Sequence, residues 1–310
     1  MTPIFCEKSS ALTPPPQMQR IALAAVFTGA IATAANPVFV RLTDLEPVAS
    51  AFHRMLWALP LMLFWAAWEP RQPRATGGAR RNRLLLALCG LFFAADLAAL
   101  HWSIELTVAA NSILFLNAQP IYVALGAWLL FGSRITSGFL AGTVVALAGA
   151  AMLTWQSLAL GGGHLVGDAL GVSAGLCYAG FILTASRLRA CFSSARVNAW
   201  TCALGTPLLL LAALGAGQDP LPRSVNDWLL MIGLGVVSQA AGQGLIVWGL
   251  AHLAPAFSAV TLLAAPVAAA LFAWWLLDEP LTSLQLLGMA VVLTGVALCV
   301  RFHTAPGFKS

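Results

Sequence analysis

The chain has 310 residues, of which 60% are hydrophobic and only 9% are charged. Because soluble globular domains carry about 25% charged residues, this composition excludes an ordinary soluble protein and predicts a surface that faces lipid. The formal net charge of +5 is informative chiefly through its distribution along the chain.

Five apolar segments of the first half are each close to the ~20 residues that a helix needs to cross ~30 Å of hydrocarbon. They cover residues 21–40, 48–68, 84–102, 108–131 and 137–155. Residues 1–20 are polar and proline-rich, which predicts a cytoplasmic tail. An A-x-A pattern in the first segment suggests a cleaved signal peptide as an alternative, but the near-span length of this segment favours a retained helix.

The second half repeats this plan after a glycine-rich linker at residues 156–167. Its expected spans are 168–186, 197–216, 228–248, 255–277 and 283–300, and residues 302–310 form a second tail. Alternating short strands, which a membrane β-barrel requires, are absent from the sequence. The sequence therefore predicts an all-α membrane protein with ten transmembrane helices, in two units at 21–155 and 168–301.

One shift of 146 positions relates the two halves without a gap. It pairs Pro120 with Pro266, Trp128 with Trp274, Gly142 with Gly288 and Gly149 with Gly295. Shared Ala and Leu are expected between any two apolar helices, but shared Pro, Trp and spaced Gly are not. The sequence therefore predicts a duplicated five-helix repeat.

The basic residues indicate how the two repeats enter the membrane. With the N-terminus in the cytoplasm, thirteen of the sixteen Lys and Arg lie on the cytoplasmic side, Arg54 lies within a span, and only Arg41 and Arg223 lie outside. This bias is the one expected of the positive-inside rule. Since each repeat has an odd number of spans, we expect inverted repeats, both termini in the cytoplasm, and a multi-pass protein of a bacterial inner membrane.

The six cysteines are Cys6, Cys89, Cys177, Cys191, Cys202 and Cys299. No CxxC pair is present and most of these residues lie in apolar stretches, so we expect buried free thiols and no metal site.

Inverted repeats can exchange inward-open and outward-open shapes around a site at the midplane. The sequence contains no HExxH, GxSxG or Walker motif, and no filter-like loop of a channel. We therefore expect a secondary transporter that is not an enzyme and needs no cofactor. The alternative is a membrane scaffold without transport, which would have a tightly packed centre.

Four stretches carry a family resemblance, namely ANPVFVRL at 35–42, PVASAFHRMLWALP at 47–60, AANSILFLNAQPIYVALGAWLLFGSRIT at 109–136, and residues 254–298. They resemble the EamA-type members of the drug/metabolite transporter superfamily. The resemblance implies a ten-helix transporter that exports amino acids or other metabolites, with YddG-type exporters of aromatic and other neutral amino acids as the nearest branch. Glu279 matches a family acid, but the first copy has Ser133 instead.

Charged groups inside the spans are the first candidates for a site, because a charge in hydrocarbon costs at least ~2.5 kcal/mol on insertion scales. At a rise of 1.5 Å per residue, His53 and Arg54 are expected ~9–10 Å below the outer surface. Asp96 is expected at a similar depth. We expect His53 or Arg54 to meet Asp96, either as a structural ion pair or as a site for a substrate carboxylate or a proton. His101 is expected near the outer interface, as a wet histidine or a site residue.

Pro120 and Pro266 are candidate hinges near the middle of their spans. Each proline removes a backbone donor and should leave a carbonyl, of Leu116 or of Leu262, without its usual helical partner. Such a kink either moves during transport or only improves packing.

The remaining candidate substrate-binding residues are polar or aromatic groups within spans: Asn111, Asn117, Tyr178, Gln239 and Gln243. Gln119 also precedes Pro120. Gln239 and Gln243 are four apart and share a helix face. These groups either line a wet cavity or join helices by hydrogen bonds and packing.

The polar groups differ between the repeats, since Arg54 falls on Trp200 and Asp96 on Gly242. One intramembrane arginine favours a small zwitterion or neutral compound over an anionic nucleotide sugar or drug on the same scaffold. The expected partners are an amino acid or similar metabolite, the lipid bilayer and protons, with no nucleic acid.

Overall fold

The computed structural model describes residues 15–69, 79–107, 109–133, 136–155, 165–278 and 280–303, without the side chains of 16, 79, 105, 109–111, 302 and 303. All regular structure in these ranges is helical, and ten segments are long and apolar enough to cross a membrane. The expected all-α fold with ten spans is therefore confirmed. The first 14 residues, the arginine-rich stretch 70–78, most of the linker (156–164) and residues 304–310 lie outside the described ranges.

The first half contains α1 (Pro16–Ala34), α2 (Asn36–Leu42), α3 (Pro47–Trp68), α4 (Ala79–Leu106), α5 (Ala109–Asn117), α6 (Gln119–Phe131) and α7 (Ser137–Thr154). The second half contains α8 (Leu165–Leu188), α9 (Ser194–Gly215), α10 (Val225–Gly233), the π-helix η2 (Leu234–Gln243), α11 (Gly244–Gly249), α12 (Pro255–Thr261), α13 (Ala264–Leu276) and α14 (Ser283–His303).

Several spans are interrupted, and proline explains where. The first span breaks at Ala35 and the fourth at Ala118, each time directly before a helix that carries a proline in its first two positions. Proline is suited to these positions because its fixed φ is helical and its missing N–H has no helical partner there. The ninth span breaks at Leu262 and Leu263, shortly before Pro266.

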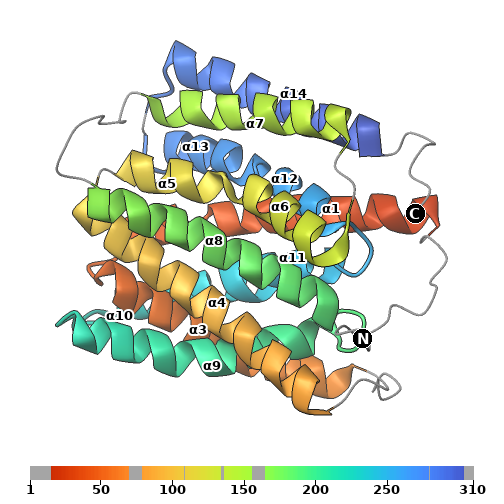
Figure 1. Cartoon of the computed structure of the whole chain (residues 1–310). Helices are drawn as coiled ribbons and strands as arrows, with labels where there is room; N and C mark the ends of the chain where they lie inside the picture. Colours follow the sequence, from red (N-terminus) through yellow and green to blue (C-terminus); the bar gives the residue numbers. More distant parts are fainter. Residues whose placement is uncertain are drawn as a thin grey trace.

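Contacts between helices follow the same 146-residue shift as the sequence. The helix α4 packs along α8, and the equivalent segments η2 and α11 pack along α1. The helices of the second and seventh spans, α3 and α9, pack on each other across the two halves, as do α7 and α14. Figure 1 shows α7 and α14 side by side at one edge of the bundle.

Glycines bring α7 and α14 to backbone contact. A Cβ placed on Gly149 would lie 2.7 Å from the carbonyl oxygen of Gly288, and one on Gly288 would lie 2.9 Å from that of Gly149. This is the close approach that small residues allow between membrane helices.

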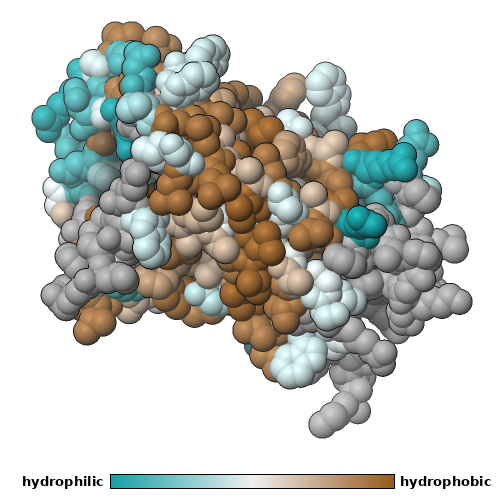
Figure 2. Space-filling model, turned by 90° about the horizontal axis from the view of Figure 1, so that it is seen from above, coloured by the Kyte–Doolittle hydropathy of each residue, from teal (hydrophilic) through white to brown (hydrophobic). Residues whose placement is uncertain are grey.

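Many large hydrophobic side chains are exposed on the surface of the bundle. Trp68, Leu129 and Trp275 are 79%, 72% and 71% exposed. Exposure of such large apolar side chains to water would be unfavourable, whereas contact with lipid is not. Figure 2 shows a hydrophobic face with hydrophilic residues gathered towards its ends. This is the surface of a multi-pass membrane protein.

The cysteines correct one expectation. Cys89, Cys177, Cys202 and Cys299 are free thiols, but Cys191 is disulfide-bonded, so the expectation of free thiols throughout is wrong there. Cys191 lies in the turn after α8 and not within a lipid-embedded span. Cys6 lies outside the described residues.

Candidate functional site

Arg54 on α3 is the charged centre of the candidate site. It is 7% exposed, and its Nε donates a hydrogen bond to Gln239 Oε1 at 3.0 Å. Its Cζ lies 5.7 Å from the centroid of the Phe93 ring. An arginine has five N–H donors, and within the described residues no hydrogen bond reaches its two terminal nitrogens. Arg54 is therefore a largely buried residue whose terminal nitrogens have no hydrogen bond within the described part of the chain.

Asp96 on α4 supplies the opposite charge. Its side chain is 3% exposed, and its Oδ1 has no hydrogen-bond partner. Asp96 and Arg54 interact electrostatically, but no direct ion pair joins them within the described part of the chain. Arg54 and Asp96 therefore interact electrostatically, as expected, but without a direct contact between their charged groups.

The packing of α8 on α4 places Tyr178 at the depth of Asp96. A Cβ on Gly171 would lie 3.1 Å from Ser103 Oγ, and one on Gly180 would lie 3.0 Å from the Phe92 ring. The two helices are thus antiparallel, and Tyr178 lies opposite Asp96, with which it interacts electrostatically.

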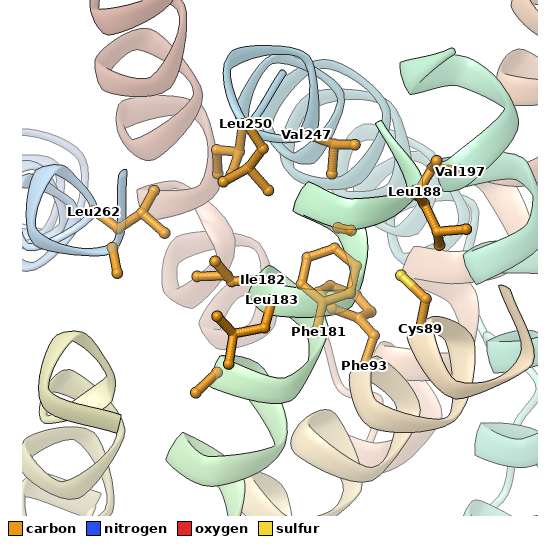
Figure 3. Close-up of a cluster of buried hydrophobic side chains, with 14 of the residues drawn as sticks. Cys89, Phe93, Phe181, Ile182, Leu183, Leu188, Val197, Val247, Leu250 and Leu262 are labelled. Carbon is orange, nitrogen blue, oxygen red and sulfur yellow. The ribbon is translucent and has the colours of Figure 1, made fainter. Parts of the chain in front are cut away.

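Tyr178 is also the half-buried member of an aromatic cluster. Its ring centroid lies 6.2 Å from that of Phe93 and 5.8 Å from that of Phe181. Phe93 and Phe181 are buried, with centroids 4.7 Å apart. Figure 3 shows these two rings facing each other between α4 and α8. The aromatic cluster therefore lies directly beside the Arg54 guanidinium.

The π-helix η2 presents both predicted glutamines to this region. Gln239 accepts from Arg54, and its Nε2 lies 3.9 Å from Cys202 Sγ. Gln243 is 1% exposed, interacts with Tyr178, and has no partner for its Nε2. Short π-helical stretches are frequent at functional sites, but the residue pattern gave no signal for this one.

The two candidate histidines, His53 and His101, have different surroundings. His53 Nε2 lies 2.7 Å from the carbonyl oxygen of Pro220, and its ring packs on Trp228 with centroids 5.6 Å apart. His53 thus holds the loop before α10, and Arg54 is the residue that faces Asp96. His101 is 7% exposed and its Nδ1 lies 2.5 Å from the Leu97 carbonyl oxygen, so it is buried and not a wet interfacial histidine.

The break between α5 and α6 carries two buried amide side chains. Asn117 and Gln119 are 7% and 6% exposed, and within the described residues neither Asn117 Nδ2 nor Gln119 Oε1 has a hydrogen-bond partner. A Cβ on Gly175 would lie 2.9 Å from the Phe115 carbonyl oxygen, so this break lies near the depth of Tyr178. The side chain of Asn111, and Glu279, lie outside the described residues.

The break before Pro266 corrects the expectation of a free Leu262 carbonyl. Ala265 N–H donates to Leu262 O at 2.9 Å. The chain tightens into a shorter turn there, which satisfies the carbonyl that the proline cannot reach. The Leu262 carbonyl is therefore not a free ligand group.

Phe93 is a residue of this site that the sequence interpretation missed. It was overlooked because an apolar aromatic within a span is usually part of the core. The 146-residue shift places it on Gln239, and that equivalence was the available signal.

A profile of the EamA-like transporter family matches residues 20–155 and 165–301. The chain belongs to the EamA-like transporter family. The protein is therefore a membrane transporter of the drug/metabolite transporter superfamily and not an enzyme.

Two relatives illustrate the similarity. An uncharacterized transporter of Archaeoglobus fulgidus is 25% identical over 268 residues, which cover 84% of this chain and 91% of the relative. A probable terminal-alkyne amino-acid exporter of Streptantibioticus cattleyicolor is 29% identical over 239 residues, covering 74% and 76%. A crystal structure that is 15% identical superposes with a TM-score of 0.74 over 91% of this chain and 96% of the other, which shows the shared fold.

Proposed function

We propose that this EamA-family transporter exports small metabolites, namely aromatic or other neutral amino acids and similar compounds, by alternating access, and that Arg54 binds the substrate carboxylate. The observation that carries this proposal is the buried, incompletely hydrogen-bonded guanidinium. A buried charge is costly unless it is paired, and a carboxylate matches the planar donors of arginine in bidentate geometry. A bound carboxylate would supply the missing partner.

The position of Arg54 between the repeats supports alternating access. Its two described contacts come from α4 of the first repeat and η2 of the second. A ligand at this guanidinium would therefore touch both halves, and a relative movement of the halves would expose it to one side or the other. The repeats that we propose as the moving units are residues 21–155 and 168–301.

An asymmetry between the broken helices supports the same mechanism. The helix α6 packs against α12. The 146-residue shift relates this pair to α13 and α5, and within the described residues α5 and α13 make no comparable contact. One end of the bundle is thus closed by a contact that its counterpart at the other end lacks. Exchanging these two arrangements would open the first end and close the second.

The chemistry of the site favours a small substrate with one carboxylate. Arg54 is the intramembrane arginine, and the half-buried Tyr178 beside it offers an aromatic surface for an apolar side chain. The relative named as a probable amino-acid exporter supports this class. The basic residues on one side support an inner-membrane protein with both termini in the cytoplasm.

Uptake of labelled neutral and aromatic amino acids into proteoliposomes, with and without a pH gradient, tests this function. We expect flux in the wild type and at least tenfold less for Arg54→Gln, since a charge-assisted hydrogen bond contributes about 1.5–3 kcal/mol. Arg223→Gln is the matched control, because the Arg223 side chain is 80% exposed. Absence of amino-acid flux in either condition would rule out the proposed substrate class.

A further inference from the structure

Asp96 is a buried acid for which the described residues provide no hydrogen bond and no ion pair. The ionisable groups that face it are Arg54 on α3, and Cys177 and Tyr178 on α8. Of these, Arg54 carries the opposite charge, and it remains beyond ion-pair distance. Within the described residues, Asp96 Oδ1 has no hydrogen-bond partner, and no hydrogen bond reaches the terminal nitrogens of Arg54. A purely structural ion pair would bring these atoms together.

An α-amino acid has the complementary arrangement of charges. Its carboxylate and its ammonium group are both attached to Cα. They therefore lie close together, but they cannot form a well-aligned ion pair with each other. Placed between Arg54 and Asp96, it would give the guanidinium an acceptor and Oδ1 a donor. Both hydrogen bonds would be charge-assisted, the stronger class.

We propose that Asp96 binds the substrate ammonium group, so that Arg54 and Asp96 together recognise the zwitterionic head of an α-amino acid. This inference rests on the proposed function, because it takes the substrate carboxylate to lie on Arg54. The side chain of the amino acid then extends towards Tyr178, whose ring borders Phe93 beneath the guanidinium.

Two consequences follow for selectivity and charge. A carboxylate without an amino group leaves Asp96 unpaired, and an amine without a carboxylate leaves Arg54 unpaired, so both bind poorly. A zwitterion carries no net charge, so binding a neutral amino acid leaves the charge of the Arg54 and Asp96 pair unchanged. Transport of a neutral amino acid by this site therefore moves no net charge.

Competition in proteoliposomes tests the proposal on the wild type. Leucine is the labelled substrate, and the competitors are 4-methylpentanoate, which lacks the amino group, and leucine methyl ester, which lacks the carboxylate. We expect each analogue to compete at least about tenfold less well than unlabelled leucine. If 4-methylpentanoate competes as well as leucine, Asp96 does not bind the substrate ammonium group. If neither leucine nor any other amino acid is transported, the proposed function itself fails.

Asp96→Asn tests the residue. We expect it to lower leucine affinity at least about tenfold while leaving 4-methylpentanoate binding within about threefold of the wild type, so that the preference disappears. Asp227→Asn is the matched control, because Asp227 is also buried but is held by Thr43 and Ser224 at the start of α10. A folded Asp96→Asn variant with an unchanged preference would overturn the proposal. Should Asp96→Asn not fold, Asp96→Glu and the wild-type competition decide it.

Discussion

Phe93 and Gln239 occupy equivalent positions of the two repeats, 146 residues apart, and both contact the guanidinium of Arg54. Phe93 offers a ring face from α4, and Gln239 offers an acceptor from η2. The duplicated backbone thus supplies two matching positions, and the side chains differ in chemistry. This gives one asymmetric site between two symmetric scaffolds, as recognition of one asymmetric substrate requires.

The two contacts of Arg54 should differ in strength. A hydrogen bond to a charged group contributes about 1.5–3 kcal/mol, whereas a cation–π contact contributes about 0.5–2 kcal/mol. Double-mutant cycles that combine Arg54→Met with Gln239→Leu or with Phe93→Leu, measured by unfolding in detergent, isolate each pair. We expect the larger coupling energy for Gln239. A larger coupling for Phe93 would show that its ring is the main support of the guanidinium, and equal couplings would contradict the expected difference.

The breaks at Ala118 and Leu262–Leu263 should act as hinges. Pro120→Ala and Pro266→Ala restore a backbone donor and favour a continuous helix, so they should slow substrate exchange several-fold while leaving substrate affinity unchanged. Pro60→Ala is the matched control, since Pro60 lies inside the uninterrupted α3. Flux and equilibrium binding are measured on the same preparations. Loss of affinity at an unchanged maximal rate would argue against hinges.

The ten spans could be predicted because each apolar run must match the bilayer thickness, and a single shift aligned the repeats without a gap. The break at Ala35 has a signal in Pro37 that the sequence interpretation missed, whereas the interruption within the eighth span has no proline to mark it. The eighth span lies close to a neighbouring backbone at Gly242, where a Cβ would lie 3.1 Å from Thr33 N. Apolar composition does not encode such contacts.

The depth of the candidate site residues in the membrane could be predicted, but the direction in which their side chains point could not. Counting residues placed Arg54 and Asp96 at one level, but His53, the neighbour of Arg54 in sequence, points to Pro220 instead. Adjacent residues on a helix lie on different faces. The α3 helix packs chiefly on α9 and not on α4, so the depth of these residues alone could not show which side chain faces Asp96.

The contact between α7 and α14 should tolerate no side chain at Gly149. A Cβ there would lie 2.5 Å from Val292 N and 2.7 Å from Gly288 O, so Gly149→Ala should destabilise the protein by about 1–3 kcal/mol through overpacking. Gly215→Ala is the matched control, because nothing lies within 4 Å of its added Cβ. It should be neutral or slightly stabilising, since alanine favours helix. Thermal unfolding in detergent measures both, and equal effects would mean that the helices separate freely.

The orientation of the repeats can be tested at the two ends of α9. Ala190 precedes this helix and Leu221 follows it, and both are exposed. Arg187, Arg189 and Arg196 flank Ala190, so the positive-inside rule places Ala190 in the cytoplasm and Leu221 outside. In intact cells, a membrane-impermeant maleimide should label Leu221→Cys, and it should label Ala190→Cys only after permeabilisation. The wild type gives the background from native cysteines, and labelling in detergent shows that both thiols react. The reverse pattern would place the second repeat, and with it both termini, the other way up.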